Sequence, residues 1–299
     1  MPPPGSWQPV PARDPSPAAG APAPRPPASA APPNGVVPRA EPTCAFCERP
    51  SGSAGYAWPD WLCDFLTEHQ SDWDLDREEP GSGLLIIDQV ASEIDQTVTC
   101  VCDHCNENWI ARLEEGVSEF VKSMIMGEAT PLPAARRKLL ARWAAKNAIV
   151  MEHTFGDGVR TPHAASEPLR KTSVHAGTQV LIGKYDGRQQ LLNRARVLFR
   201  KDTSNDLYVT YTTMIVGKLL IQVLADPWND TPPEVPGTAA PRFIPLVGNR
   251  SRNVEWPPEI ASGDAFFEAV RRGPNVEPRG RNRLMKSRAA TPMDRARQA

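Results

Sequence analysis

The sequence predicts an α+β fold in which a metal-binding segment with two packed helices precedes a smaller β-rich unit. Three observations support this prediction. Two Cys-x-x-Cys pairs lie in the first part of the chain, two segments with helical periodicity follow the second pair, and runs rich in β-branched residues come later. A chain of 299 residues is long enough for one or two domains.

The two cysteine pairs are Cys44-Ala-Phe-Cys47 and Cys102-Asp-His-Cys105. Each pair can present two thiolates to one tetrahedral ion, and four sulfurs complete a structural zinc site. Paired thiols in a reducing compartment bind metal more often than they form disulfides. We therefore expect zinc at Cys44, Cys47, Cys102 and Cys105, and the alternative is four ordinary reduced cysteines.

Three further residues near these pairs have other expected roles. Cys63 lies in an apolar context and is expected in the core. Cys100, two positions before Cys102, would share a strand face with it and could compete as a ligand. His104 lies inside the second pair and is expected to point to solvent.

The helical pattern is clearest in two segments. In residues 107–126, apolar side chains recur at three-to-four spacing, and Gly127 is placed to end the helix. The second helix is expected over about 133–152, with Pro133 suited to its first turn. Residues 190–200 fit a strand or a helix. Strands are expected at 84–87, 97–101, 179–183, 207–216 and 218–224.

Changes in composition divide the chain into four expected parts. The first part is rich in Pro and Ala, and Lys and Arg outnumber acids in the last, so both ends are expected to be disordered. The four parts are a tail over 1–40, a zinc-binding domain over 41–155, a β-containing C-terminal unit over 174–270 and a basic tail over 271–299.

The second helix carries a basic face that is a candidate for phosphate contacts with nucleic acid. Its residues are Arg136, Arg137, Lys138, Arg142 and Lys146. A solvated helix face is the alternative interpretation. The formal net charge of -1 argues against a dedicated nucleic-acid binder.

The sequence also bears on location. No apolar run approaches the roughly 18 residues of a membrane span, and the first residues lack the basic and apolar regions of a secretory signal. We therefore expect a cytoplasmic protein with no membrane partner.

The order of these motifs resembles that of the HNH endonuclease superfamily, in the version whose treble-clef fold is stapled by zinc. The two Cys-x-x-Cys pairs resemble its knuckles, Pro59-Asp-Trp-Leu62 resembles the turn after its acid-His dyad, and Asn106 matches its Asn. The resemblance covers residues 44–152 and extends to a subgroup common in actinobacteria and their phages. It implies an α+β treble-clef domain with structural zinc. In active members a dyad His activates water beside a divalent metal.

The sequence departs from this family at the dyad. Gly55-Tyr56-Ala57-Trp58 stands where an acid and a His would precede Pro59, and none of these side chains can serve as a general base or a hard-metal ligand. The fold is expected to be retained and hydrolysis lost. If activity remains, the resemblance implies catalysis by Asn106 with a relocated His69 or His104, and Mg or Mn as the metal.

Two histidines that follow a Glu also have simple structural interpretations that need no catalytic role. Glu68-His69 lies past the Pro turn, where an exposed helix-end His is common, and His153 fits a helix C-terminal cap. Three functions therefore stand as hypotheses. The first is an HNH-like zinc protein with a degenerate nuclease site that binds DNA or a protein partner. The second is an active metal-dependent endonuclease with a relocated His, and the third is a protein-interaction scaffold.

Overall fold

The computed structural model has a mixed α+β architecture and describes part of the chain. The described residues are 42–52, 54–69, 96–187, 193–202, 207–233, 243–248 and 254–266. The predicted tails over 1–40 and 271–299 and the predicted strand at 84–87 lie outside them. The described residues, from Pro42 onward, all belong to one compact unit.

The segment that carries the two cysteine pairs begins with short elements. Strand β1 (Gly55–Tyr56) pairs antiparallel with β2 (Thr97–Val98). The predicted turn after Pro59 is the start of a helix, α1 (Asp60–Glu68), because Pro59 adopts the extended conformation of an N-cap residue. Only the first part of the predicted strand at 97–101 is a strand.

A continuous helical stretch follows the second cysteine pair. It consists of α4 (Asp103–Cys105), one π-helical turn η1 (Asn106–Ile110) and α5 (Ala111–Met126). The predicted helix at 107–126 is thus confirmed and starts earlier. Gly127 ends it with φ of 82°, a left-handed conformation that glycine adopts without steric cost, and its N–H donates to the Met124 carbonyl.

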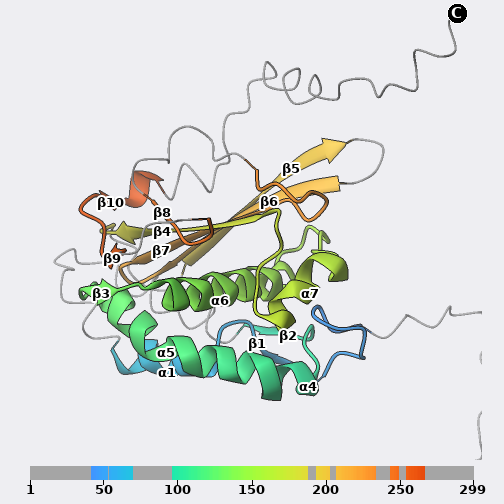
Figure 1. The fold of residues 1–299 in the computed structure, drawn as a ribbon. Coiled ribbons are helices and arrows are strands. Elements are labelled where there is room, and N and C mark those ends of the chain that lie inside the picture. Colours follow the sequence, from blue (N-terminus) through green and yellow to red (C-terminus); the bar gives the residue numbers. More distant parts are fainter. Residues whose placement is uncertain are drawn as a thin grey trace, which may run out of the picture. The chain divides into compact units, whose positions relative to one another are not determined.

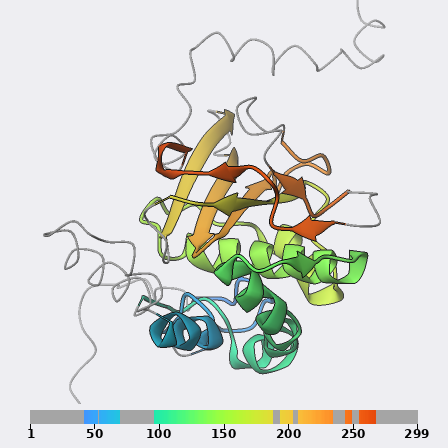
Figure 2. The same cartoon turned by 90° about the vertical axis from the view of Figure 1, so that its left-hand side faces the viewer.

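Helix α6 (Ala134–Glu152) confirms the second predicted helix. It contacts α5, α7 (His163–Lys171) and two strands of the main sheet, so side chains around most of its circumference are buried. Figures 1 and 2 show α6 between the sheet and the layer that holds α1 and α5. Because of this central position, several charged side chains of α6 are buried.

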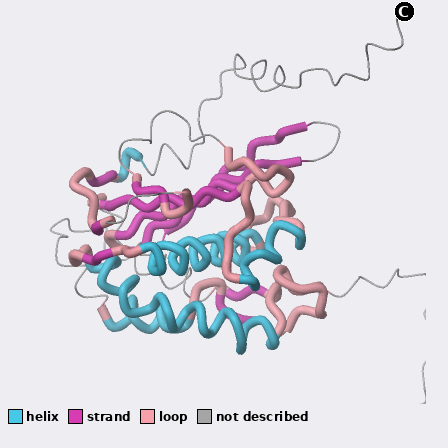
Figure 3. Tube along the Cα trace, in the orientation of Figure 1, coloured by secondary structure: helices cyan, strands magenta, loops and turns pink. Residues whose placement is uncertain are grey.

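The main sheet has six strands, and Figure 3 shows the long helices on one side of it. Its order is β10-β4-β7-β6-β5, with β8 also paired to β4. The segment 190–200, which fitted strand or helix, contributes the edge strand β5. The strands are β4 (Thr178–Tyr185), β5 (Asn193–Asp202), β6 (Leu207–Val216), β7 (Leu219–Ala225), β8 (Ile244–Pro245) and β10 (Ala261–Ser262).

A second small ladder joins the C-terminal part to the helices. Strand β3 (Thr130–Pro131), between α5 and α6, pairs antiparallel with β9 (Glu255–Trp256). The Leu132 N–H also donates to the Val254 carbonyl at 2.8 Å. Trp256 is almost fully buried.

Successive side chains of each strand point to opposite faces of the sheet, so the two faces contribute to two separate buried clusters. One face, with Ile182, Met214 and Ile221, packs on α6 and belongs to the same buried cluster as the four cysteines and Trp143. The opposite face forms a second cluster. Its buried members are Leu181, Tyr185, Ala195, Tyr211, Ile215, Leu220 and Leu224. The segment that carries the cysteine pairs and the sheet therefore share one continuous core.

Candidate metal centre and its surroundings

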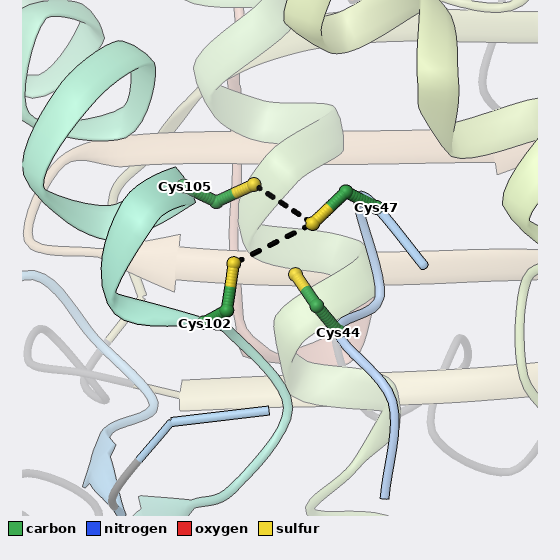
Figure 4. Close-up of side chains that lie close together, drawn as sticks. All are labelled: Cys44, Cys47, Cys102 and Cys105. Atoms are coloured by element: carbon green, nitrogen blue, oxygen red, sulfur yellow. Dashed lines mark hydrogen bonds between the residues drawn. The ribbon is translucent and has the colours of Figure 1, made fainter. Parts of the chain in front are cut away.

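The structure brings the four predicted cysteines together. Their sulfur atoms all lie within 4.8 Å of one another, and all four residues are buried. Cys47 Sγ lies 3.4 Å from Cys102 Sγ and 3.6 Å from Cys105 Sγ. Figure 4 shows the two pairs entering from separate segments with their sulfurs facing one another. These separations are far longer than the roughly 2 Å of a disulfide bond.

The geometry fits a metal ion bound by four thiolates. Sulfurs that each lie about 2.3 Å from a tetrahedral ion are about 3.8 Å apart. The measured separations of 3.4 and 3.6 Å are close to this value and the upper limit of 4.8 Å leaves room for small adjustments. Among the residues that the structure describes, no His or carboxylate joins this group. The site can therefore hold a metal ion with sulfur ligands alone.

Backbone hydrogen bonds tie the two cysteine pairs to each other. The Ala45 N–H donates to the Cys100 carbonyl at 2.7 Å, and the Gly52 N–H donates to the Val101 carbonyl at 2.9 Å. The Phe46 side chain is fully buried and packs edge-to-face on Trp109, with ring centroids 5.2 Å apart. The two segments thus approach closely through main-chain bonds and one aromatic pair.

Helix α7 holds the first cysteine pair from outside through two side chains, His163 and Ser166, here called the α7 clamp. His163 Nε2 lies 3.1 Å from the Phe46 carbonyl oxygen, and Ser166 Oγ donates to the Ala45 carbonyl at 2.6 Å. Ser166 is fully buried. The clamp fixes the main chain between the two sulfurs of this pair, which is the kind of outer support that orients metal ligands.

Burial affects the thiols strongly. It raises the pKa of the Cys44 and Cys105 thiols above the ordinary value. At Cys47 burial also acts to raise the pKa, but a backbone hydrogen bond at Arg49 and bonds from neighbouring thiols outweigh it, so the pKa is lowered. A bound cation would favour the thiolate form of all ligands and release their protons.

The two spare cysteines are buried apart from this group. Burial raises the pKa of Cys100 to about 12, with a smaller contribution from Cys44. A neutral thiol is a poor metal ligand, and the sulfur of Cys100 is not among the four that converge. Cys63 lies in the core, as predicted.

The predicted catalytic residues are placed as follows. His69 follows α1, and its Nδ1 lies 3.0 Å from the Phe65 carbonyl oxygen. His104 is exposed on α4, and Asn106 is exposed at the start of η1. In the described part of the chain, neither His69 nor His104 joins a group of potential metal ligands.

Most of the predicted basic face of α6 does not lie at the surface. Arg137, Arg142 and Lys146 are buried because α6 lies inside the molecule. The Lys146 ammonium pairs with Glu114 of α5 at 2.6 Å, and Arg142 donates to the Leu169 carbonyl of α7 at 2.6 Å. These side chains join helices to one another.

The other two members of the set lie nearer the surface. Lys138 is exposed, and Arg136 donates to the Pro131 carbonyl at 3.1 Å. The sequence pattern could not reveal this division, since it depends on what packs around α6.

A basic groove that the sequence did not predict lies beside the metal centre. It has a volume of about 520 Å³ between the helical stretch after the second cysteine pair and α7. Its cations Arg112, Arg170 and Lys171 are exposed. One carboxylate, that of Glu167, pairs with Lys171 at 2.8 Å. The other groove residues are His104, Asn108 and Trp109. The groove brings together residues more than fifty positions apart, so no local motif signalled it.

Burial also sets the behaviour of the residue after α6. His153 is the C-cap residue of α6, as predicted. Its pKa is lowered to about 4, first by burial and then by the charges of Arg160 and Arg196. The side chain is therefore neutral at physiological pH.

Comparison with protein-family models, with curated proteins and with solved structures found no match for this chain. None of the helices in the described part of the chain combines the length and apolar character needed to cross a bilayer.

Proposed function

We propose that this is an HNH-like protein whose four cysteines hold a structural zinc ion and whose basic groove binds nucleic acid without cleaving it. The observation that carries the proposal is the convergence of four buried sulfurs with no other protein ligand among the described residues. Four thiolates complete the coordination of zinc and leave no open position for a reactive water. The metal would then supply folding energy and not hydrolysis.

The basic groove supports the binding half of the proposal. Within the described residues, Arg112 and Arg170 form no salt bridge, although the charge of Arg170 also acts on the Glu167 carboxylate that pairs with Lys171. Their exposed guanidinium groups can therefore reach phosphates. Arg is well suited to this contact because its planar group can bond a phosphate through two N–H donors. The groove also lies on the helix that follows the second cysteine pair, so zinc binding would hold its wall in place.

The first experiment is elemental analysis of the purified protein. We expect one zinc per chain. Cys102→Ser should lose the metal and unfold the protein, whereas the matched control Cys63→Ala should keep the metal because its sulfur lies outside the group. A Cys102→Ser protein that kept its zinc and its melting temperature would refute the site.

The second experiment separates binding from cleavage. With added Mg or Mn we expect no plasmid nicking. Metal-dependent nicking that disappears in His69→Ala or His104→Ala would establish the endonuclease hypothesis in place of this one.

Duplex DNA binding tests the groove itself. Replacing Arg112 and Arg170 by Gln should reduce the slope of log affinity against log salt by about 2, whereas Lys138→Gln, an exposed cation on α6, should leave it unchanged. Binding of a protein partner that is insensitive to salt, without any DNA binding, would support the scaffold hypothesis.

A further inference from the structure

A second hollow lies away from both the metal centre and the basic groove. It has a volume of about 370 Å³ and is lined by the loop 157–161, the start of β6 and the turn after β7. Tyr208, Pro227 and Trp228 supply its apolar walls. Trp228 is 48% exposed, which is unusual for an indole in a folded protein. The hollow shares no residue with the groove.

The exposure of Trp228 is built into a rigid turn. The carboxylate of Asp226 is buried. It accepts hydrogen bonds from the backbone N–H of Trp228 at 3.2 Å and from the side-chain amide of Asn229 at 2.6 Å. The Asp226 N–H in turn donates to the Gly177 carbonyl at 2.9 Å. The structure therefore holds the turn from two sides.

Gly177 is required for this arrangement. A Cβ atom at Gly177 would lie 2.1 Å from the Asn229 carbonyl oxygen and 2.3 Å from that of Asp226. No other residue fits under the turn. The indole is thus presented at a defined place, and its exposure does not come from a loose loop.

The facing loop is held by a buried charge network centred on Glu152. The Thr161 N–H and hydroxyl donate to the two Glu152 carboxylate oxygens at 2.6 and 2.7 Å. Arg196, whose side chain is 1% exposed, pairs with Glu152 at 3.5 Å and with Asp157 at 3.2 Å. This network fixes both ends of the loop 157–161 beneath the hollow.

The network also decides the charge that the hollow offers to a ligand. Arg196 engages both carboxylates, so neither is available to a cationic ligand. Arg160 lines the hollow with a side chain that is 36% exposed. Its Nη1 donates to the Val159 carbonyl at 2.8 Å and lies 3.7 Å from the Asp157 carboxylate, so its remaining N–H groups are the ones that can meet a ligand. Its guanidinium is the group best placed to meet an anion.

We propose that this hollow binds an unpaired nucleobase together with its phosphate, the base against Trp228 and the phosphate at Arg160. Indole and phenol faces stack on any nucleobase, and a neighbouring cation holds the backbone phosphate. The volume is near the lower end of the roughly 300–1,000 Å³ range of small-molecule sites, which fits a single nucleotide. A duplex cannot present the face of a paired base to the indole.

Two kinds of molecule carry an unpaired base with its phosphate, namely a free mononucleotide and an unpaired nucleic-acid strand. The strand form rests on the proposed nucleic-acid function, whereas the free-nucleotide form does not. The test therefore uses full-length protein with two probes. These are a fluorescein-labelled oligothymidylate of twelve nucleotides, followed by anisotropy, and unlabelled AMP as a competitor.

We expect the wild-type protein to bind the labelled strand. Trp228→Ala should weaken binding about 5- to 150-fold, the range for loss of one base–aromatic stack. Arg160→Gln should reduce the salt slope by about 0.7, the value for one phosphate contact on a single strand. The matched control is Tyr56→Ala, because Tyr56 is an aromatic residue with a similar exposure of 52% that does not line the hollow. It should bind as the wild type does.

The outcomes are distinct. Displacement of the strand by AMP identifies a nucleotide site, and strand binding that resists AMP but depends on Trp228 identifies a single-strand site. Wild-type affinity in Trp228→Ala, no binding of either probe, or Trp228-dependent binding of a polyproline peptide instead would overturn the proposal. Binding abolished only by Gln at Arg112 and Arg170 would leave the proposed function intact and refute this inference alone. Equal zinc content of all variants shows that they are folded.

Discussion

Removal of the Ser166 hydroxyl tests whether the α7 clamp supports the metal centre. Ser166 is buried, and Ser166→Ala deletes its 2.6 Å hydrogen bond to the carbonyl of the half-buried Ala45 while leaving every cysteine in place. A hydrogen bond contributes about 0.5–1.5 kcal/mol net, and a buried acceptor left without a partner costs about 1–3 kcal/mol. Because Ala45 is half-buried, we expect the lower part of this range, a fall in the free energy of unfolding of about 1 kcal/mol.

Metal affinity should fall as well, because the Ala45 carbonyl belongs to the loop between Cys44 and Cys47. Loss of an outer-shell hydrogen bond typically reduces metal affinity about 10- to 100-fold. The assay is competition for zinc with a chromogenic chelator, combined with urea unfolding of the zinc-loaded protein. The two measurements separate looser metal binding from a general loss of stability.

The control is Ser118→Ala. The Ser118 hydroxyl also donates to a carbonyl, that of Glu115 at 3.2 Å, but it does so on the exposed surface of α5. The same chemical change should there alter stability by less than about 0.5 kcal/mol. If Ser166→Ala behaved like Ser118→Ala in both assays, the α7 clamp would have no role in holding the first cysteine pair.

Three further predictions concern buried charge. Lys146→Met should lower the free energy of unfolding by about 3 kcal/mol, since it leaves Glu114 without its partner, yet oligonucleotide binding at varied salt should not change. Glu152→Ala should cost about 3–5 kcal/mol in urea unfolding because it removes one of the two carboxylates that balance the buried Arg196 and both acceptors of Thr161, and a loss below 1 kcal/mol would contradict the network. His153→Gln should improve stability under acid. The His153 pKa of about 4 lies below the unfolded value, so its contribution to stability is complete above about pH 6.5 and is lost as the pH falls toward 4. After allowance for partial exposure we expect the variant to retain about 1 kcal/mol more than the wild type at pH 5, and parallel pH profiles of the two proteins would contradict this.

Local patterns were sufficient for most of the secondary structure. Apolar spacing located α5 and α6, and the φ of 82° at Gly127 agrees with its predicted place at a helix end. β-Branched and aromatic residues located β4, β6 and β7. The segment that forms β5 was ambiguous because its decisive interactions are the hydrogen bonds to β6 and not features of its own sequence.

The predicted basic face of α6 failed for a related reason. A helical wheel places Arg137, Arg142 and Lys146 opposite the apolar side, where solvent is the default environment. In the structure α5, α7 and the sheet enclose α6, and Lys146 and Arg142 reach partners on α5 and α7. The exposed cations Arg112 and Arg170 belong to two different elements, so only tertiary packing joins them.

The sequence by itself determined the chemistry that the chain can offer near its metal centre. Two Cys-x-x-Cys pairs are defined by spacing alone, and the absence of a His before Pro59 is a matter of residue identity. Only the tertiary structure decided which charges reach solvent, how α7 holds the first pair and where Trp228 stands above a hollow. The physical reason is that coordination chemistry depends on residue type and short spacing, whereas burial and the meeting of distant side chains depend on how whole helices and strands pack.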